Sequence, residues 1–247
     1  MSGPRLLTSR LLGGFRHGFT TREGGGSRGP FRSLNLSASV GDDPERVLEN
    51  WERLRQATGL AFARVRLVHG CRVVEADAGA EPGEEADAVI SAFPGVAASV
   101  SVADCAPVLI ADPRSGSAAA VHAGWRGTLA RVAAEGVRAL VERHGARPSD
   151  LLAAIGPSIG PCCFEVSREL AVRFRDELGA ATGNPRNLGS RADLWLANEQ
   201  ILRAAGLARR RIEVLGRCTS CEDDVFFSHR RDQGRTGRHL AFIAPVS

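Results

Sequence analysis

Hydrophobic residues recur along this chain with two different periods, one helical and one extended. Apolar residues three and four positions apart predict amphipathic helices at 42–59, 127–145, 167–179 and 193–206. Asp42 and Asp43 are expected to cap the first helix, which ends at Gly59. Its expected buried face consists of Val47, Leu48, Trp51 and Leu54.

Short apolar runs predict strands between and after these helices. Their ranges are 65–68, 71–76, 87–90, 97–103, 106–111, 117–123, 151–155, 212–215 and 240–244. Several of these strands are joined by tight turns rather than by helices, which argues against a doubly wound parallel sheet. The pattern therefore predicts an α+β fold of layered mixed β-sheets flanked by helices, in a single domain that covers residues 1–247.

The composition is that of an ordinary globular protein, with 43% hydrophobic and 24% charged residues. No apolar run is long enough for a secretion signal or a bilayer span, so we expect a cytoplasmic protein without a membrane partner. In that compartment the six cysteines are expected to be free thiols or ligands rather than disulfides. The net charge is +4, but every cation is an arginine and most are dispersed, so we expect no nucleic-acid partner.

The predicted hairpin at 106–123, which turns at the sequence DPRSG, carries the first candidate chemistry. Its register places Pro107 opposite His122 and Cys105 one diagonal step from His122. Across this gap the two side chains can share a metal ion or make a direct Cys–His hydrogen bond. His69, at the end of another predicted strand, is a third candidate ligand.

Three protein ligands with an open fourth position are typical of catalytic metal sites. The alternative interpretation is a small buried cysteine and two histidines that are satisfied by the backbone.

Two further segments contain residues suited to an anion. Arg126 follows Trp125 directly before a predicted helix, whose N-terminus favours an anion. Arg230 and Arg231 lie in the turn-rich stretch 226–238, and paired guanidinium groups bind phosphate in bidentate fashion. A solvated basic turn is the alternative.

A single C-x-x-C motif runs from Cys218 to Cys221. Together with Cys162 and Cys163 it could form a four-thiolate zinc site, or it could be a redox pair. Adjacent cysteines are poor partners for this motif, and no thioredoxin-like βαβ unit surrounds it. We therefore expect Cys218 and Cys221 to bind nothing.

Six motifs in a fixed order give the chain a resemblance to a known family. They are VHG at 68–70, ADCAPVLIAD at 103–112, VHAGWRG at 121–127, AIGPSIGPCCFEV at 154–166, CT at 218–219 and FFSHRRD at 226–232. Over nearly its whole length the chain resembles the YfiH-like family, also called the laccase-domain or multicopper polyphenol oxidase family. Leu67 and His229 stand where that family usually has Gln and Tyr, so they bear on substrate preference. His229 could also add a fourth metal-binding or acid–base group.

The resemblance implies a single α+β domain, similar in fold to the cysteine-hydrolase domain of necrotizing-factor toxins. It implies a metal site, usually zinc, at His69, Cys105 and His122. It also implies phosphorolysis of adenosine, inosine, guanosine and 5′-methylthioadenosine, with deamination of adenosine in some members. The expected partners are purine nucleosides and phosphate, bound by a monomer or small homo-oligomer.

We therefore predict a zinc-dependent purine nucleoside phosphorylase with adenosine deaminase side activity. The expected catalytic residues are His69, Cys105, His122 and Asp104, the last as a proton-handling or supporting carboxylate. The expected substrate and phosphate ligands are Arg126, Arg230 and Arg231.

Two other activities are kept as alternatives. A Cys105–His122 amide hydrolase, for example one that edits muramyl-peptide precursors, would not need His69. A polyphenol oxidase with a single copper at the same three ligands is the other, because copper outcompetes zinc at such ligands. Four-copper oxidation is not expected, since it needs about ten histidines with His-x-His pairs, and the chain has six histidines and no such pair.

Overall fold

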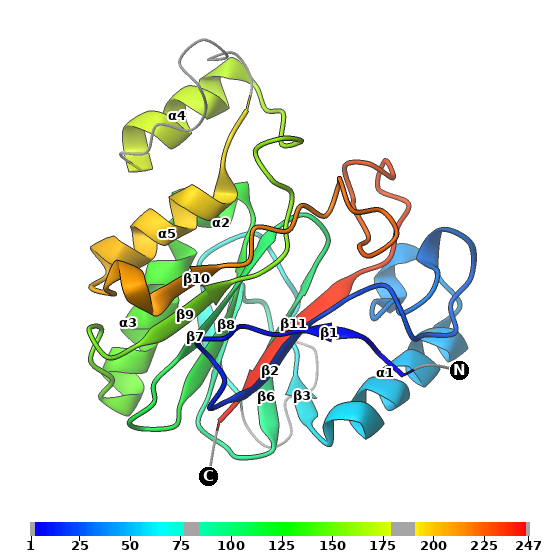
Figure 1. The fold of residues 1–247 in the computed structure, drawn as a ribbon, viewed down its shortest axis with the longest axis horizontal. Coiled ribbons are helices and arrows are strands. Elements are labelled where there is room, and N and C mark those ends of the chain that lie inside the picture. Colours follow the sequence, from blue (N-terminus) through cyan, green and yellow to red (C-terminus); the bar gives the residue numbers. More distant parts are fainter. Residues whose placement is uncertain (1–2, 77–83, 179–190, 246–247) are drawn as a thin grey trace.

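The computed structural model describes residues 3–76, 84–178 and 191–245, and its strands form two sheets (Figure 1). In spatial order, the first sheet consists of β1 (Leu6–Leu7), β2 (Arg16–Thr20), β11 (His239–Ala244), β6 (Val96–Val102) and β3 (Ala61–Ala63). The second consists of β10 (Ile212–Val214), β9 (Leu152–Ile155), β7 (Ala106–Ala111), β8 (Ala118–Ala123), β5 (Ala88–Ser91) and β4 (Val73–Glu75). Both sheets are mixed, because β3 pairs with β6, β10 with β9 and β4 with β5 in parallel while the other neighbours are antiparallel.

Helices cover the outer faces of both sheets (Figure 1). The first sheet is covered by α1 (Pro44–Thr58), and the second by α3 (Val132–His144) and α5 (Leu194–Ala204). Beyond them, α4 (Arg168–Leu178) packs against α5, and the short α2 (Trp125–Leu129) precedes α3. Single 3₁₀ turns occupy Gly29–Phe31, Ala38–Val40 and Arg209–Arg211.

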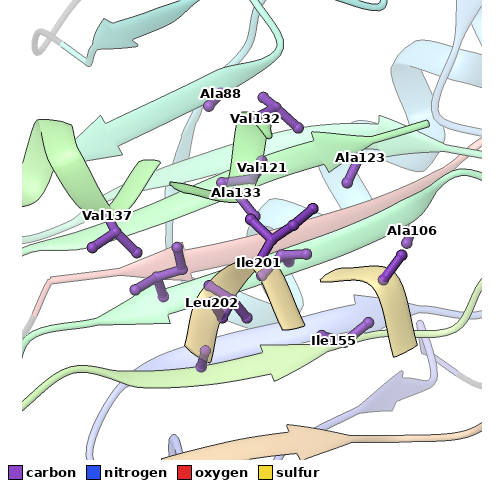
Figure 2. Packing of buried hydrophobic residues seen from close by; sticks show 14 of the residues in the cluster. Ala88, Ala106, Val121, Ala123, Val132, Ala133, Val137, Ile155, Ile201 and Leu202 are labelled. Carbon is purple, nitrogen blue, oxygen red and sulfur yellow. The ribbon is translucent and has the colours of Figure 1, made fainter. Parts of the chain in front are cut away.

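Three hydrophobic clusters hold these layers together. One joins α1 to the first sheet through residues such as Trp51 and Phe242. A second, rich in alanine, lies between the two sheets. The third joins the second sheet to α3 and α5, where Val121 on β8 packs with Val137 and Leu202 (Figure 2). The order helix, sheet, sheet, helix confirms the predicted α+β class of layered mixed sheets.

Most predicted strands are confirmed within two residues, and 106–111 coincides with β7. The predicted strand at 65–68 is wrong, because Arg66 there forms only an isolated bridge with Glu85, and the strand lies at Ala61–Ala63 instead. The strands β1 and β2 were not predicted. Two leucines are too short a signal, and the sequence RHGFT shows no run of apolar residues.

The helix predicted over 127–145 is divided into α2 and α3. Arg131 separates them with φ 59°, a left-handed conformation that ends one helix before the next begins. No glycine or proline lies at residues 129–132, so the sequence does not indicate this break. Tertiary contacts favour it, since Asn198 of α5 donates a hydrogen bond to Thr128 Oγ1 at 3.2 Å.

One expected core position on α1 is wrong. Leu48 is 68% exposed, whereas Val47, Trp51 and Leu54 are buried. Consecutive helix positions are about 100° apart, so the buried stripe through 47, 51 and 54 leaves Leu48 beside it. Among the helices of the described residues, none combines the length and apolar character needed to cross a membrane.

The two leucines of α1 give a matched test of this packing. Leu54→Ala should lower the free energy of unfolding by about 2–5 kcal/mol, because it removes a fully buried side chain. Leu48→Ala, the same change on the same helix, should alter it by less than about 0.5 kcal/mol. Urea denaturation of both variants measures the difference, and equal losses would contradict the assignment of the α1 face.

Candidate metal centre

Three separate segments bring the expected metal ligands together. His122 lies on β8, Cys105 directly precedes β7, and His69 lies in the loop before β4. Their sulfur and ring-nitrogen atoms all lie within 4.8 Å of one another. The two imidazole rings stand at 83°, with centroids 5.0 Å apart. The register that predicted this meeting is confirmed, since Pro107 pairs with His122.

The three ligands differ in their access to solvent. His122 is buried at 3% exposure, Cys105 is half-buried and His69 is exposed. His69 also has φ 60°, which turns the chain sharply at this point. The centre therefore has a buried floor at His122 and an open side at His69, where a small molecule can approach.

Asp87, a buried carboxylate that was not predicted as a site residue, orients His122. Its Oδ1 accepts a hydrogen bond from His122 Nδ1 at 2.8 Å and another from the backbone N–H of His69 at 2.9 Å. Its Oδ2 accepts one from the backbone N–H of Gly70 at 2.6 Å. Burial opposes ionisation, but the hydrogen bonds from His122 and Gly70 outweigh it and hold the pKa of the Asp87 carboxyl below its usual value. With His122 Nδ1 donating to Asp87, its Nε2 is left for a metal or for Cys105.

The position of Asp87 follows from the pairing of β5 with β8. Ala88 faces Val121, so the preceding residue Asp87 comes beside His122, whose backbone N–H also donates to the Asp87 carbonyl oxygen at 2.7 Å. The sequence signal was an aspartate at the start of the predicted strand 87–90. The neighbour of that strand could not be assigned from the sequence, so the partner of Asp87 was not visible.

Gly124 leaves room for the three ligands. A Cβ at this position would lie 2.9 Å from Cys105 Sγ and 3.5 Å from His69 Cδ2, closer to the sulfur than real Cβ atoms come. Any side chain at Gly124 would therefore displace the sulfur. This crowding explains why a glycine follows the strand that carries His122.

The charges of Cys105 and His122 support each other. Burial raises the pKa of the Cys105 thiol. The positive charge of His122 and hydrogen bonds from His122 and His69 outweigh this effect and lower the pKa to about 6. Burial lowers the pKa of His122, but the Cys105 thiolate and the hydrogen bond to Asp87 raise it to about 9. Without metal, the pair therefore carries a thiolate and an imidazolium near neutral pH. A thiolate is also the form of cysteine that binds zinc.

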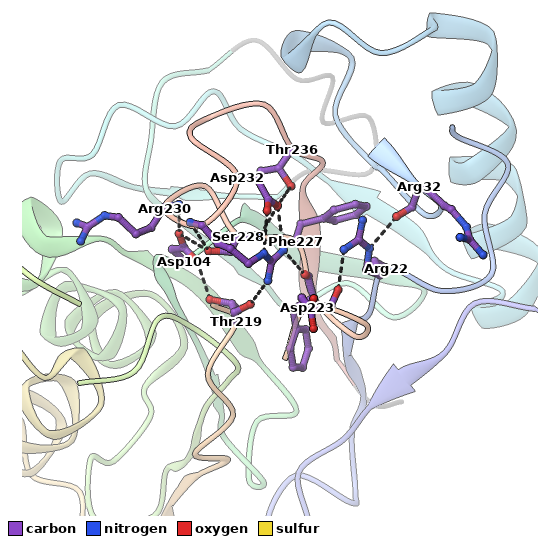
Figure 3. A network of polar contacts seen from close by, with 12 residues as sticks. Arg22, Arg32, Asp104, Thr219, Asp223, Phe227, Ser228, Arg230, Asp232 and Thr236 are labelled. Atoms are coloured by element: carbon purple, nitrogen blue, oxygen red, sulfur yellow. Dashed lines mark hydrogen bonds and ion pairs between the residues drawn. The ribbon is translucent and has the colours of Figure 1, made fainter. Parts of the chain in front are cut away.

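Asp104 accepts hydrogen bonds from the segment that contains the FFSHRRD motif and from Thr219 (Figure 3). Its Oδ1 accepts a hydrogen bond from Thr219 Oγ1 at 2.6 Å. Its Oδ2 accepts hydrogen bonds from Ser228 Oγ at 3.1 Å and from the backbone N–H of Arg230 at 2.7 Å. Asp104 is buried and has φ 83°, so the chain bends sharply just before Cys105. These contacts indicate that Asp104 positions the 219–230 segment beside Cys105, and its expected proton-handling role stays a prediction.

The two adjacent arginines of the FFSHRRD motif have different surroundings. The Arg231 guanidinium is bound internally, to both carboxylate oxygens of Asp232 and to the carbonyl oxygens of Thr219 and Phe226. The exposed Arg230 points away from Asp104 and donates to the Glu165 carbonyl oxygen at 2.8 Å (Figure 3). The paired cradle expected from sequence is therefore not formed, since Arg231 already has its partners.

Arg230 lines a surface pocket of about 420 Å³ together with the aromatic residues Trp125 and Phe164. Its guanidinium carbon lies 5.5 Å from the centre of the Phe164 ring. Arg126, exposed on α2, stacks over Trp125 with 4.2 Å from its guanidinium carbon to the ring centre. Trp125, in the wall of this pocket, lies three residues after the candidate ligand His122 in the sequence.

Arg238 was not among the expected phosphate ligands, although it stands in the same arginine-rich stretch as Arg230 and Arg231. Burial lowers the pKa of Arg238, while the negative charges of Cys105 and Asp104 raise it. The guanidinium of Arg238 therefore interacts electrostatically with Cys105 and Asp104. His229 is exposed, and within the described residues it is not part of the three-ligand cluster.

The fold and the centre agree with what this chain is similar to. The sequence profile of the family described as "Multi-copper polyphenol oxidoreductase laccase" matches residues 16–245. The chain belongs to this family. The purine nucleoside phosphorylase of Deinococcus radiodurans is 44% identical over 234 residues, which cover 92% of this chain and 88% of the relative. The purine nucleoside phosphorylase YfiH of Escherichia coli is 38% identical over 230 residues, 91% of each chain.

Solved structures extend the comparison to the fold. The crystal structure of YlmD from Geobacillus stearothermophilus matches with a TM-score of 0.92 at 35% identity, and the match covers 100% of this chain and 97% of that one. The resemblance read from the six motifs is thereby confirmed. Members of this family thus include proteins named as phosphorolytic enzymes, although the description of the family names copper oxidation.

Replacing Asp87 tests how far the metal site depends on it. Asp87→Asn should weaken zinc binding 10- to 100-fold, because the amide no longer fixes His122 with its Nε2 free. Asp112→Asn is the matched control, since Asp112 is another buried carboxylate that holds the turn at the far end of the same hairpin. Competition with a chelating dye measures both affinities, and equal weakening would contradict a specific role for Asp87.

The pKa of Cys105 gives a second test, in metal-free protein. The rate of Cys105 alkylation should rise with pH around a midpoint near 6, because the thiolate forms above its pKa. His122→Asn should move the midpoint toward the ordinary thiol value of about 8.5, because it removes the imidazolium. Mass spectrometry of the Cys105 peptide follows the reaction, and a midpoint that His122→Asn leaves unchanged would refute the pairing.

Proposed function

We propose that the chain is a metal-dependent purine nucleoside phosphorylase, with zinc held by His69, Cys105 and His122. The observation that carries this proposal is the three-ligand cluster, with its sulfur and nitrogen atoms within 4.8 Å and His122 oriented by Asp87. One thiolate and two imidazoles suit zinc, and three ligands leave a position for another group. A zinc ion there would supply a Lewis acid and lower the pKa of a bound water. The names of the relatives from D. radiodurans and E. coli support phosphorolysis as the reaction class.

In phosphorolysis a phosphate oxygen forms a bond to the ribose anomeric carbon as the bond from that carbon to the purine nitrogen breaks. The electron pair of the broken bond leaves with the purine, which must gain a proton. The pocket beside Trp125 and Phe164 offers flat apolar surfaces of the kind that stack on a purine ring. Two arginines offer positive charge for binding phosphate. Arg230 lines the same pocket, and the guanidinium of Arg238 interacts electrostatically with Cys105.

The charge at the centre explains why phosphate needs these arginines. Zinc with one thiolate and two neutral imidazoles retains a charge of about +1, too little to hold a phosphate dianion by itself. The chain has no lysine, so the added cations must be arginines. Their planar guanidinium groups bind phosphate through two parallel hydrogen bonds.

Deamination of adenosine at the same centre is part of the proposal, because a water of lowered pKa can replace an amino group on a purine carbon. The amide hydrolase remains a second candidate on a specific observation. Cys105, His122 and Asp87 are arranged as a nucleophile, its base and the group that orients the base. His69 separates the two activities, since a hydrolase of this kind needs only the other three residues.

The role of Arg230 can be tested without disturbing the metal ligands. Arg230→Ala should raise the phosphate KM for nucleoside cleavage 10- to 100-fold, because charge-assisted hydrogen bonds to phosphate are worth about 1.5–3 kcal/mol each. Arg235→Ala, an exposed arginine of the same segment, is the control and should leave the KM unchanged. Adenosine deamination, which uses no phosphate, should lose much less than phosphorolysis.

Two outcomes would change this assignment. Equal loss of phosphorolysis and deamination would give Arg230 a role in purine binding. An unchanged phosphate KM would remove it from the phosphate site and leave Arg238 as the candidate cation. Absence of any phosphate-dependent cleavage in zinc-loaded protein, with hydrolysis of an amide that survives His69→Ala, would favour the hydrolase.

A further inference from the structure

A second group of metal-binding side chains lies outside the centre described above. Cys162, Cys163, Cys218 and Cys221 bring all four Sγ atoms within 4.8 Å of one another. The Cys221 sulfur lies 3.3 Å from that of Cys163 and 3.5 Å from that of Cys162. The adjacent pair and the C-x-x-C motif, which were not expected to act together, therefore lie side by side. The adjacent pair and the motif belong to different loops that meet.

The backbone brings these loops together independently of the cysteines. The parallel pairing of β9 with β10 continues beyond the strands as a bridge between Ser158 and Cys218. The Thr219 N–H donates to the Ser158 carbonyl oxygen at 3.0 Å, and the Ser158 N–H donates to the Arg217 carbonyl oxygen at 3.2 Å. The pairing therefore fixes the register of the two loops and sets the C-x-x-C motif against the adjacent pair.

The sulfur distances distinguish a shared metal from a disulfide. Four sulfurs around a tetrahedral zinc, with Zn–S bonds of about 2.3 Å, lie about 3.8 Å from one another. The distances of 3.3 and 3.5 Å from Cys221 Sγ to the sulfurs of Cys163 and Cys162, and the limit of 4.8 Å for all pairs, lie around that value. A disulfide requires about 2.05 Å, and the cysteines of the described residues are free thiols.

The surroundings of Cys218 also suit a metal-bound thiolate. Cys218 is buried, and its sulfur accepts a hydrogen bond from the backbone N–H of Gly160 at 3.2 Å. Such a donor stabilises negative charge on sulfur. Four thiolates form a closed ligand set of the kind found in structural zinc sites, which have no open position.

We propose that Cys162, Cys163, Cys218 and Cys221 form a second zinc site, structural rather than catalytic. Zn²⁺ binding replaces the four thiol protons, which pass to solvent, so no oxidant is involved. The ion cross-links the loop after β9 to the loop after β10. Thr219, between the two cysteines of the motif, donates to Asp104 at 2.6 Å, next to the ligand Cys105. The second site therefore braces the segment that borders the first one.

Metal counting on the full chain tests this proposal. Zinc-loaded wild-type protein, purified with reductant and freed of loose metal, should contain about two zinc ions per chain. Cys221→Ser, which changes an exposed ligand, and Cys105→Ser should each lower the content to about one. Cys71→Ser is the matched control, since Cys71 is the cysteine that belongs to neither group, and it should keep both ions.

Cobalt substitution identifies which site is filled, and it also works on unaltered protein. Sulfur-to-cobalt charge-transfer absorption grows with the number of thiolates bound, so wild-type protein should absorb far more strongly than one thiolate can explain. Cys221→Ser should lose most of this absorption, whereas Cys105→Ser should lose little. This measurement on wild-type protein decides the question even if a cysteine variant fails to fold.

Two results would overturn the second site. One is a wild-type content of one zinc that Cys105→Ser abolishes and Cys221→Ser leaves intact. The other is a disulfide among these four cysteines, detected by mass spectrometry of protein prepared with reductant, which would make the group a redox pair. Either result leaves the three-ligand centre and its proposed function unaffected.

Discussion

The hydrogen bond between Asp87 and His122 is the interaction on which the candidate metal centre depends. One buried carboxylate fixes the His122 ring through its side chain and holds the His69 loop through two backbone N–H groups. Burying a charge is costly unless it is compensated by hydrogen bonds, and Asp87 has three such donors. The same residue therefore sets the direction of a buried ligand and the place of an exposed one. Cys105 completes the group from the other side of β8, where β7 pairs with it.

The candidate centre also depends on the segment after β10, which is far from Cys105 in the sequence but lies beside it in the structure. Asp104 joins three donors from Thr219, Ser228 and Arg230, so the loops that follow β10 are tied to the residue before Cys105. Cys218 and Cys221 lie in the same stretch after β10, and they meet Cys162 and Cys163 from the loop after β9. The cysteine contacts and the Asp104 contacts both fix the segment 218–230. The position of Arg230 therefore depends on both sets of contacts.

The sequence predicted what depends on local periodicity and on one clear turn. The 106–111 strand and the hairpin register were predicted because DPRSG marks the turn and the residues on both sides of it are mostly apolar, and the meeting of Cys105 with His122 followed from them. His69 was a separate candidate at the end of another predicted strand. Asp87 could not be identified, because its role depends on β5 pairing with β8, a contact between segments with no connecting turn. Likewise, the four-thiolate alternative was set aside because the two cysteine pairs meet through the β9–β10 pairing, a contact between segments that periodicity does not reveal. The break at Arg131 and the exposure of Leu48 depend on tertiary packing, which periodicity alone does not contain.

The cluster between the two sheets has a consequence for how this architecture changes over evolution. Its facing strands contribute mostly alanines, among them Ala98 and Ala241 from one sheet and Ala120 and Ala154 from the other. Side chains this small let the sheets approach closely, so a larger residue at any of these positions would force the layers apart. The interior between the sheets therefore tolerates little change in side-chain volume. This limit concerns volume rather than residue identity, so it is compatible with a backbone that matches a relative at a TM-score of 0.92 while 35% of the residues are identical.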